Sequence, residues 1–278
     1  MIGLARSTFY YKSKQISESE KRDNTDLRDL IEKIALEWPH YGYRRVTAEL
    51  ERRGKKVNHK KVARIMREEA LTCEITRKYL RPKNKKTGEE RFNVAPNLTE
   101  KLCLRGPNQL WVSDITYVRL DQDFVFVAVI LDAWSRRVIG WAISRTMQVE
   151  LTLAALKMAI LLRKPKPGCI HHSDRGSQYT SNAYGEMLKR AGLKPSMSKP
   201  GYPYDNAIAE SFMRTLKKEE VDCTEYKDIE DLKGRIPYFI EKIYNEKRLH
   251  SALGYLPPAE YEGKRPKKTR VVMQVSLS

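Results

Sequence analysis

Three acidic residues stand in contexts and at spacings that suit work on phosphate. Asp114 lies in WVSDITY, Asp174 lies in HHSDRGSQYTS, and 35 residues separate Asp174 from Glu210. Cleavage of a phosphodiester requires an activated attacking oxygen and a stabilised leaving oxygen, and two divalent ions about 4 Å apart provide both when carboxylates hold them. Mg²⁺ prefers such oxygen ligands and keeps positions open for water and phosphate. We therefore treat Asp114, Asp174 and Glu210 as candidate catalytic residues and metal ligands.

The segment around Glu210, PYDNAIAESFMRTLKKEEV, has the pattern of a helix. At about 100° per residue, four further side chains lie within about 60° of Glu210, namely Asn206, Met213, Arg214 and Lys217. Lys217 is about 10 Å further along the axis, where it can hold a phosphate or base beside the reacting one. The alternative is an amphipathic surface helix in which Glu210 pairs with Arg214, four residues on.

The charge of the chain predicts an anionic partner. Its 278 residues include 53 Lys and Arg against 35 Asp and Glu, a net charge of +18. An excess of this size is typical of nucleic-acid binding, because neutralising phosphates releases their counterions. The longest apolar run, Phe124 to Ala133, is interrupted by Asp132 and is far shorter than the roughly 20 residues that span a membrane. We expect no membrane association, and the opening MIGLARSTFYYK is too short in its apolar part for a secretory signal.

The basic excess is concentrated near the N-terminus. Between residues 40 and 92 there are 17 Lys and Arg against 7 Asp and Glu. GYRRVTAELERRG predicts a helix that turns Val46 and Leu50 inward and ends before Gly54. VNHKKVARIMREEAL predicts a second helix capped by Asn58. Two helices joined by a short glycine turn form the helix-turn-helix pattern.

The second of these helices has one apolar and one basic face. Val62, Ile65 and Met66 form the predicted buried stripe. The opposite face supplies three candidate DNA contacts, Lys60, Arg64 and Arg67. The alternative is a solvated charged face with no partner. Residues 77–91, rich in Lys, Pro and Gly, are predicted to form a flexible basic linker.

The second half of the chain predicts alternating strands and helices. QLWVSDITYVRL, FVFVAVIL and RVIGWAIS predict three strands joined by short connections, with Asp132 as a turn residue. A helix over VELTLAALKMAILLR, a strand at CIHHSD, a helix at SNAYGEMLKRAG and a stretch near LKPSMS precede the helix of Glu210. Pro237 predicts a kink or break in the helical pattern that follows. This order indicates a mixed sheet flanked by helices, an α/β domain.

Three more residues near the acids are candidates for contact with DNA. His172 shares a strand face with Asp174 and either contacts the scissile phosphate or orients the strand end. Tyr202 and Tyr204 flank Pro203 in the loop before the Glu210 helix, where they either stack on a base or pack against the protein.

Together these motifs resemble a known family. WVSDITY, LDAWSRRVIGWAIS, HHSDRGSQYTS and GYPYDNAIAESFMRTLKKE look like the core of retroviral-integrase-like (DDE) transposases, encoded in the second, OrfB-like reading frame of small bacterial insertion sequences. HYGYRRVTAELERRGKKVNHKKVARIM looks like the helix-turn-helix that precedes this core, and YNEKRLHSALGYLPPAEY looks like its usual C-terminal end. The resemblance covers nearly the whole chain.

The resemblance implies a fold and a division into domains. The expected fold is an RNase-H-like mixed sheet flanked by helices, preceded by a small all-α helix-turn-helix domain, with the three acids at the edge of the sheet. We expect an N-terminal helical remnant at 1–24, a DNA-binding domain at 25–80, a basic linker at 81–102, the catalytic core at 103–265 and a tail at 266–278.

The resemblance also implies a reaction. Asp114 would bridge two Mg²⁺ or Mn²⁺ ions, which Asp174 and Glu210 would complete, for 3′-end cleavage and strand transfer without a covalent protein intermediate. Expected partners are double-stranded DNA (element ends and target), further copies of the chain on DNA, and a fused or associated first-frame product. The expected location is the bacterial cytoplasm, at the nucleoid. Two alternatives stay open: a nuclease or resolvase that only hydrolyses, and a non-catalytic DNA-binding regulator.

Overall fold

The structure is a computed structural model that describes residues 18–71, 94–100, 102–120, 123–199, 206–264 and 271–272. The chain divides into two compact units, Met1–Ile75 and Thr76–Ser278. Each unit has its own buried apolar residues.

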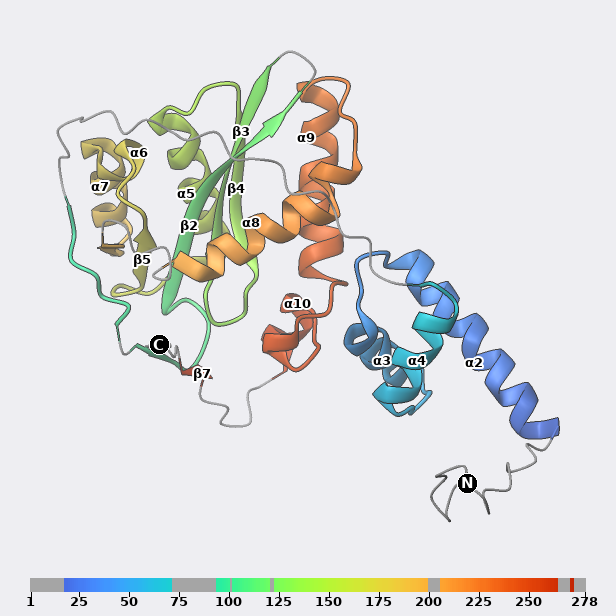
Figure 1. Ribbon diagram of the computed structural model, residues 1–278. Helices are drawn as coiled ribbons and strands as arrows, with labels where there is room; N and C mark the ends of the chain where they lie inside the picture. Colours follow the sequence, from blue (N-terminus) through green and yellow to red (C-terminus); the bar gives the residue numbers. More distant parts are fainter. Residues whose placement is uncertain are drawn as a thin grey trace, which may run out of the picture. The chain divides into compact units, whose positions relative to one another are not determined.

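In the described part of the first unit there are three helices, drawn in blue to cyan in Figure 1. These are α2 (Glu18–Glu37), α3 (Tyr43–Arg52) and α4 (His59–Glu68). Their apolar faces supply the buried core, Leu27, Ile31, Ile34, Val46, Leu50, Val62, Ile65 and Met66. Because α2 runs unbroken from residue 18 to 37, the expected domain boundary between residues 24 and 25 falls inside a helix.

The predicted helix-turn-helix elements are present in this unit. Gly54 follows α3 with a φ of +83°, a left-handed conformation that glycine adopts without strain. Asn58 caps α4, since its side chain accepts a hydrogen bond of 2.9 Å from the backbone nitrogen of Lys60. Val62, Ile65 and Met66 are buried, as the pattern predicts.

The second unit contains a five-stranded sheet in the order β4-β3-β2-β5-β6. β2, β3 and β4 are antiparallel neighbours, whereas β5 runs parallel to β2 and β6 parallel to β5. The strands are β2 (Leu110–Arg119), β3 (Phe124–Asp132), β4 (Val138–Ser144), β5 (Ile170–Ser173) and β6 (Lys194–Met197). The strands predicted from sequence are confirmed, with ends shifted by a residue or two.

Helices cover both faces of this sheet (Figure 1). One apolar cluster joins the sheet to α5 (Val149–Arg163), α6 (Ser177–Thr180) and α7 (Asn182–Arg190). A second cluster joins its other face to α8 (Ala207–Glu219) and α9 (Ile229–Tyr238). On β3, Val127 and Val129 belong to the α8 side, while Ala128 and Ile130 belong to the α5 side. The continuous apolar run of β3 is explained by burial on both faces.

Further short elements complete the second unit. They are β1 (Cys103–Leu104) paired with β7 (Val271–Val272), η2 (Val221–Cys223), η3 (Phe239–Asn245), η4 (Ser251–Leu253) and α10 (Pro258–Gly263).

The break predicted at Pro237 is present. The regular helix α9, which contains Pro237, ends at Tyr238, and the chain continues as the π-helical segment η3.

This arrangement is the RNase-H-like mixed sheet expected from the sequence, preceded by a helical unit. An antiparallel meander, β2-β3-β4, is extended on the β2 side by two parallel strands, and helices flank both faces. In the described part of the chain, none of the helices has the length and apolar character needed to traverse a lipid bilayer.

Candidate active site

The first two acids lie where β2 and β5 separate. β2 pairs with β5 from Leu110 to Val112. Asp114 is two residues beyond this pairing, in the middle of β2, and Asp174 directly follows the end of β5. Because parallel strands present their carboxyl ends at one edge, the fold brings these two acids to the same region of the sheet.

Asp174 begins the turn that leads into α6. Its side chain is exposed, and its Oδ1 accepts a hydrogen bond of 2.9 Å from the backbone nitrogen of Gly176. This bond is the local side-chain contact that Asp makes in turns. The second carboxylate oxygen is left to face solvent or a ligand.

Glu210 lies in the first turn of α8 and is partly buried. The helix is held on the sheet by an apolar stripe that includes Ile208, Phe212 and Leu216. Since these residues point to the core, Glu210 lies on a different face of the helix, where it is partly buried and its charge reaches Asp114 on β2.

The charges of the three acids act on one another. The pKa of the Asp114 carboxyl is raised to about 7, chiefly because the side chain is removed from water, and the carboxylates of Asp174 and Glu210 raise it further. The Ile115 amide, 2.8 Å from Asp114 Oδ1, and the Lys217 ammonium act in the opposite direction. The pKa of Asp114 therefore depends on the charges of both other acids and of Lys217, although these residues come from separate elements of the chain.

The carboxylates do not close around an ion in this conformation. Within the ranges that the structure describes, no three His, Cys, Asp or Glu side chains are arranged tightly enough to hold a metal. Their chemistry nevertheless suits a divalent cation, because carboxylate oxygens are the ligands that Mg²⁺ and Mn²⁺ prefer. A cation beside Asp114 would also offset the repulsion that raises its pKa.

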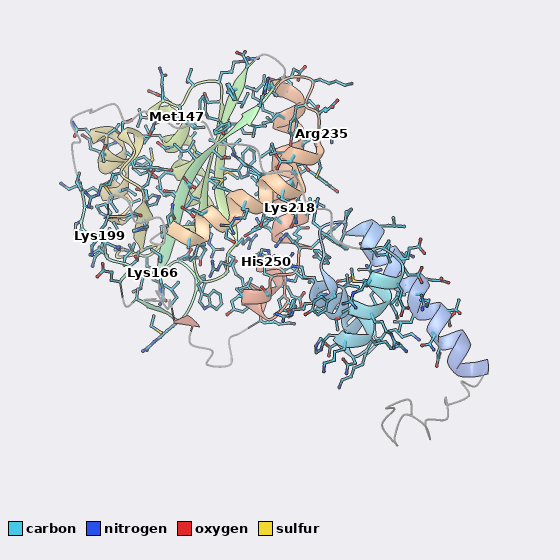
Figure 2. All side chains as sticks on the ribbon, in the orientation of Figure 1. Met147, Lys166, Lys199, Lys218, Arg235 and His250 are labelled. Atoms are coloured by element: carbon cyan, nitrogen blue, oxygen red, sulfur yellow. The ribbon has the colours of Figure 1, made fainter. Side chains whose placement is uncertain are left out.

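Beyond Glu210, α8 carries three cations, Arg214, Lys217 and Lys218. Arg214 is exposed, and Lys217 is partly buried with its Nζ 4.3 Å from the ring centroid of Tyr117 on β2. This distance is that of a cation–π contact, which fixes the ammonium near the acids. The next residue, Lys218, is labelled on α8 in Figure 2.

Asn206 occupies a different position from the one predicted. It is only 7% exposed, and its Nδ2 donates a hydrogen bond of 2.9 Å to the backbone carbonyl of Ser113. The prediction that Asn206 contacts DNA is corrected, because its amide points into the protein and donates a hydrogen bond to the backbone of β2. The helical wheel placed it beside Glu210 but did not show how close the sheet is.

His172 is also directed inward. It is fully buried, and its Nδ1 and Nε2 lie 2.9 and 3.0 Å from the hydroxyls of Ser196 and Ser198. The prediction of a DNA contact is corrected, whereas the alternative, that His172 orients the strand end, agrees with these contacts. Arg175 holds the same segment, since its Nε donates a hydrogen bond of 2.9 Å to the backbone carbonyl of Ser198.

The other predicted contacts have two different outcomes. Tyr202 and Tyr204 lie outside the described residues. Lys60, Arg64 and Arg67 are exposed along α4, and Arg64 lies 3.6 Å from Glu68. A contact between these cations and DNA stays a prediction.

Sequence reasoning missed one residue next to the acids. Tyr179, in α6, is buried, and the charges of Asp114 and Asp174 contribute to raising the pKa of its phenol after burial and Tyr184. The only available signal was its place in HHSDRGSQYTS, five residues after Asp174. An aromatic residue there can equally be a core residue, which explains why it was not singled out.

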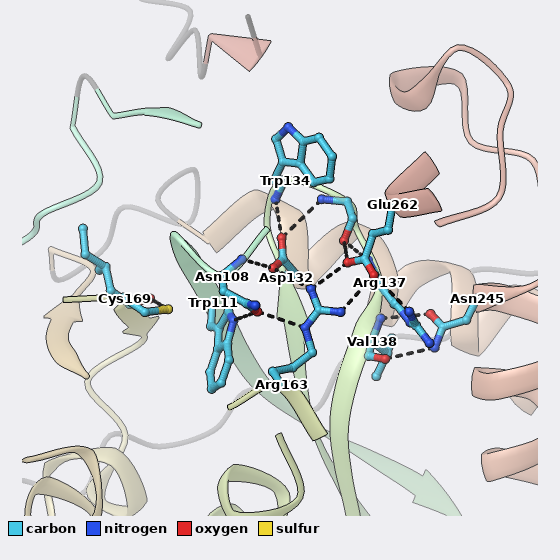
Figure 3. Close-up of polar contacts among 12 residues, drawn as sticks. Asn108, Trp111, Asp132, Trp134, Arg137, Val138, Arg163, Cys169, Asn245 and Glu262 are labelled. Atoms are coloured by element: carbon cyan, nitrogen blue, oxygen red, sulfur yellow. Dashed lines mark hydrogen bonds and ion pairs between the residues drawn. The ribbon is translucent and has the colours of Figure 1, made fainter. Parts of the chain in front are cut away.

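Asp132 is a turn residue, as predicted, and not a fourth acid of the site. It is completely buried, and Oδ1 accepts hydrogen bonds from the backbone nitrogens of Trp134 and Ser135 at 3.0 and 3.3 Å (Figure 3). Arg163 lies 3.5 Å from its other oxygen and also binds Glu262 of α10. This network fixes the C-terminal helix to the sheet.

Comparison with known families supports the two-unit organisation. A model described as an integrase core domain matches residues 105–203, and a second integrase core model matches residues 191–258. A model described as an HTH-like domain matches residues 21–79. The chain thus carries an integrase core preceded by an HTH-like domain.

Curated relatives cover most of the chain. The 31 kDa protein of insertion element IS600 from Shigella sonnei is 36% identical over 95% of this chain and 97% of its own length. Transposase InsF of IS3A from Escherichia coli is 40% identical over 81% of this chain and 77% of its own length. The transposase of IS904 from Lactococcus lactis is 36% identical over 80% and 87%. The chain belongs to this family of insertion-sequence transposases.

Solved structures resemble the chain more distantly. The simian T-cell lymphotropic virus intasome matches with a TM-score of 0.47 and 15% identity over 88% of this chain and 78% of that chain. The HTLV-2 integrase catalytic core domain in complex with magnesium matches with a TM-score of 0.44 and 17% identity over 57% and 99%.

Proposed function

We propose that this protein is the transposase of an insertion sequence and that it cleaves the 3′ ends of the element and joins them to target DNA. The observation that carries the proposal is that the fold brings the acids together. Asp114 lies on β2, Asp174 follows the neighbouring strand β5, and Glu210 and Lys217 lie on α8, whose first turn is bonded to the backbone of β2. Four charged groups from three elements act within one site, in a chain of net charge +18. Family membership supports the same activity.

Asp114, Asp174 and Glu210 would hold two Mg²⁺ or Mn²⁺ ions. When bound, such ions activate an attacking oxygen and stabilise a leaving oxygen during phosphoryl transfer. The chain itself supplies the alignment. β2 and β5 fix two of the acids, α8 fixes the third, and Lys217 neutralises phosphate charge beside them.

The proposed partners follow from this chemistry. Exposed cations on α4 (Lys60, Arg64 and Arg67) and on α8 (Arg214) would bind the backbone of double-stranded DNA at the element ends and target. Pairing of two element ends calls for more than one active site, so we propose a homo-oligomer on DNA, with a first-frame product fused or associated. A reaction on chromosomal DNA would take place at the nucleoid, in the cytoplasm.

A pre-cleaved DNA end tests the proposed reaction. A labelled oligonucleotide with a free 3′ hydroxyl at the element terminus is incubated with the protein, supercoiled target and Mg²⁺. Appearance of the label covalently joined to target supports a transposase. Nicking or degradation of the DNA without joining would instead indicate a nuclease that only hydrolyses, and binding without any cleavage would indicate a regulator.

A further inference from the structure

The first turn of α8 departs from the usual pattern of helix caps. Asn206 is the N-cap residue of the helix, with φ −117° and ψ 25°. An asparagine at this position normally accepts a hydrogen bond from a backbone nitrogen two or three residues on. Among the described residues, the Asn206 side chain makes no such capping bond and donates instead to the carbonyl of Ser113, 93 positions earlier. Within the part of the chain that the structure describes, helix α8 therefore lacks a side-chain cap at its N-terminus and is instead hydrogen-bonded to β2.

That single bond lies between two of the proposed catalytic acids. Ser113 directly precedes Asp114 on β2, and Asn206 lies four residues, one helical turn, before Glu210 on α8. The 2.9 Å bond therefore links the backbone beside Asp114 to the turn beside Glu210. A rotation of α8 about its axis would break this bond and carry the Glu210 side chain away from Asp114.

The apolar contacts of α8 do not fix this rotation as sharply. Ile208, Phe212 and Leu216 hold the helix on the sheet, but apolar contact is not directional. A hydrogen bond requires a donor close to the line of the acceptor, so it selects one orientation. β5 pairs with β2 only as far as Val112, and the Ser113 carbonyl is free to take this donor.

The other amide atom of Asn206 indicates that the residue does more than fill space. Its Oδ1 is buried and has no hydrogen-bond partner among the residues that the structure describes. Burying an unsatisfied acceptor is unfavourable, and an apolar side chain of similar volume would avoid it. The donor function thus outweighs the unfavourable burial of the acceptor.

We propose that Asn206 is a positioning residue that orients Glu210 toward Asp114 through the Ser113 carbonyl. This inference rests on the proposed function, since it assumes that Asp114 and Glu210 act on a shared metal site. Asn206 acts through another residue and need not touch DNA or an ion itself. Groups that orient metal ligands in this way typically change metal affinity or activity by about 10-fold to 100-fold when they are removed.

The same fold contains a matched control. Asn245 in η3 is also buried and also binds the backbone of a strand, accepting from the Val138 nitrogen at 3.0 Å and donating to its carbonyl at 2.9 Å (Figure 3). Val138 begins β4, at the edge of the sheet, with β3 lying between it and β2. Loss of Asn245 removes an equivalent anchor away from the acids.

The test compares Asn206→Ala and Asn206→Ser with Asn245→Ala in the full chain. Serine preserves the ability to cap the helix but cannot reach β2. Mn²⁺ binding is measured by electron paramagnetic resonance of the free ion, strand transfer is followed against Mg²⁺ concentration, and DNA affinity is measured separately. We expect both Asn206 variants to weaken Mn²⁺ binding and slow strand transfer by about tenfold or more. DNA affinity should stay within about twofold, since the amide makes no phosphate contact.

Asn245→Ala is expected to lower the melting temperature while leaving the Mn²⁺ affinity unchanged. Wild-type Mn²⁺ affinity and transfer in both Asn206 variants would overturn the inference, and so would an equal loss of Mn²⁺ affinity in Asn245→Ala. Glu210→Gln is included to separate two failures. If Glu210→Gln itself binds Mn²⁺ and transfers strands normally, the proposed function fails, whatever Asn206 does.

Discussion

Arg248 holds the far end of the helix that carries Glu210. Its Nε and Nη2 lie 2.7 and 2.6 Å from the two carboxylate oxygens of Glu219, in the last turn of α8. The side chains of Arg248 and Glu219 are only 5% and 10% exposed. Since Asn206 ties the first turn to β2, α8 is fixed at both ends, with Glu210 between them.

Breaking this pair from one side should destabilise the fold. Arg248→Met leaves the Glu219 carboxylate buried without its partner, and we expect a loss of about 3 kcal/mol in the free energy of unfolding. The double variant Glu219→Gln with Arg248→Met removes both charges and should recover most of this loss. Urea unfolding of the two single variants and the double variant measures the coupling, and strictly additive losses would contradict it.

The exposed cations of α4 predict a salt-dependent DNA affinity. Arg67→Ala should reduce the slope of log affinity against log salt by about 0.9, the value expected for one lost phosphate contact on duplex DNA. Lys33→Ala, an exposed cation of α2, is the matched variant. The measurement is fluorescence anisotropy with duplex DNA over a range of salt concentrations. Equal slopes for Arg67→Ala and wild type would argue that α4 does not contact phosphate.

α5 packs so closely on β4 at Gly140 that there is no room for a side chain. A Cβ at Gly140 would lie 2.3 Å from the Ala155 carbonyl oxygen and 2.9 Å from the Ala159 Cβ. We expect Gly140→Ala to destabilise the protein by about 1–3 kcal/mol, as overpacked substitutions do. Gly185→Ala is the control, because nothing lies within 4 Å of its added Cβ and alanine favours the α7 helix by about 0.5–1 kcal/mol. Thermal unfolding should give shifts of opposite sign, and a neutral Gly140→Ala would contradict the close contact.

The raised pKa of Asp114 predicts how metal-free stability depends on pH. The folded state holds the Asp114 proton up to about pH 7, whereas an ordinary Asp loses it near 3.8. Between these values the folded state binds more protons, so this group makes stability fall as pH rises. Asp114→Asn should therefore be more stable than wild type at pH 8, and the difference should vanish below about pH 4.

Melting temperatures in EDTA across this pH range provide the measurement. Addition of Mg²⁺ at pH 8 should stabilise the wild type and not Asp114→Asn, because a ligand that binds only the folded state raises its stability. An Asp114→Asn variant that is less stable than wild type at pH 8 in EDTA would show that the carboxylate is favourable where it lies.

Sequence reasoning succeeded where the signal is local or periodic. The apolar runs gave β3 and α5 nearly to the residue, and Asn58 and Gly54 marked the ends of α4 and α3. Both depend on neighbours in the chain, which a single sequence contains.

It failed where a polar side chain finds its partner far along the chain. Asn206 was predicted to contact DNA because the helical wheel places it beside Glu210, but its amide donates to Ser113. For His172, one of the two interpretations was a contact with the scissile phosphate, but its ring nitrogens lie against Ser196 and Ser198 and agree with the other interpretation, that it orients the strand end. A buried hydroxyl or carbonyl at such separation leaves no periodic pattern. The short helix α6 was missed because four residues give no measurable periodicity.

The most direct test of the proposed active site is strand transfer by single carboxylate variants. Asp114→Asn, Asp174→Asn and Glu210→Gln are compared with wild type on a pre-cleaved element end in Mg²⁺, with DNA affinity measured in parallel. The control is Glu150→Gln, which changes an exposed acid in the first turn of α5. Each of the three site variants should transfer at least about a thousandfold more slowly, about 4 kcal/mol in the barrier, and bind DNA as wild type does. Transfer at the wild-type rate by any one of them would contradict a shared metal site at Asp114, Asp174 and Glu210.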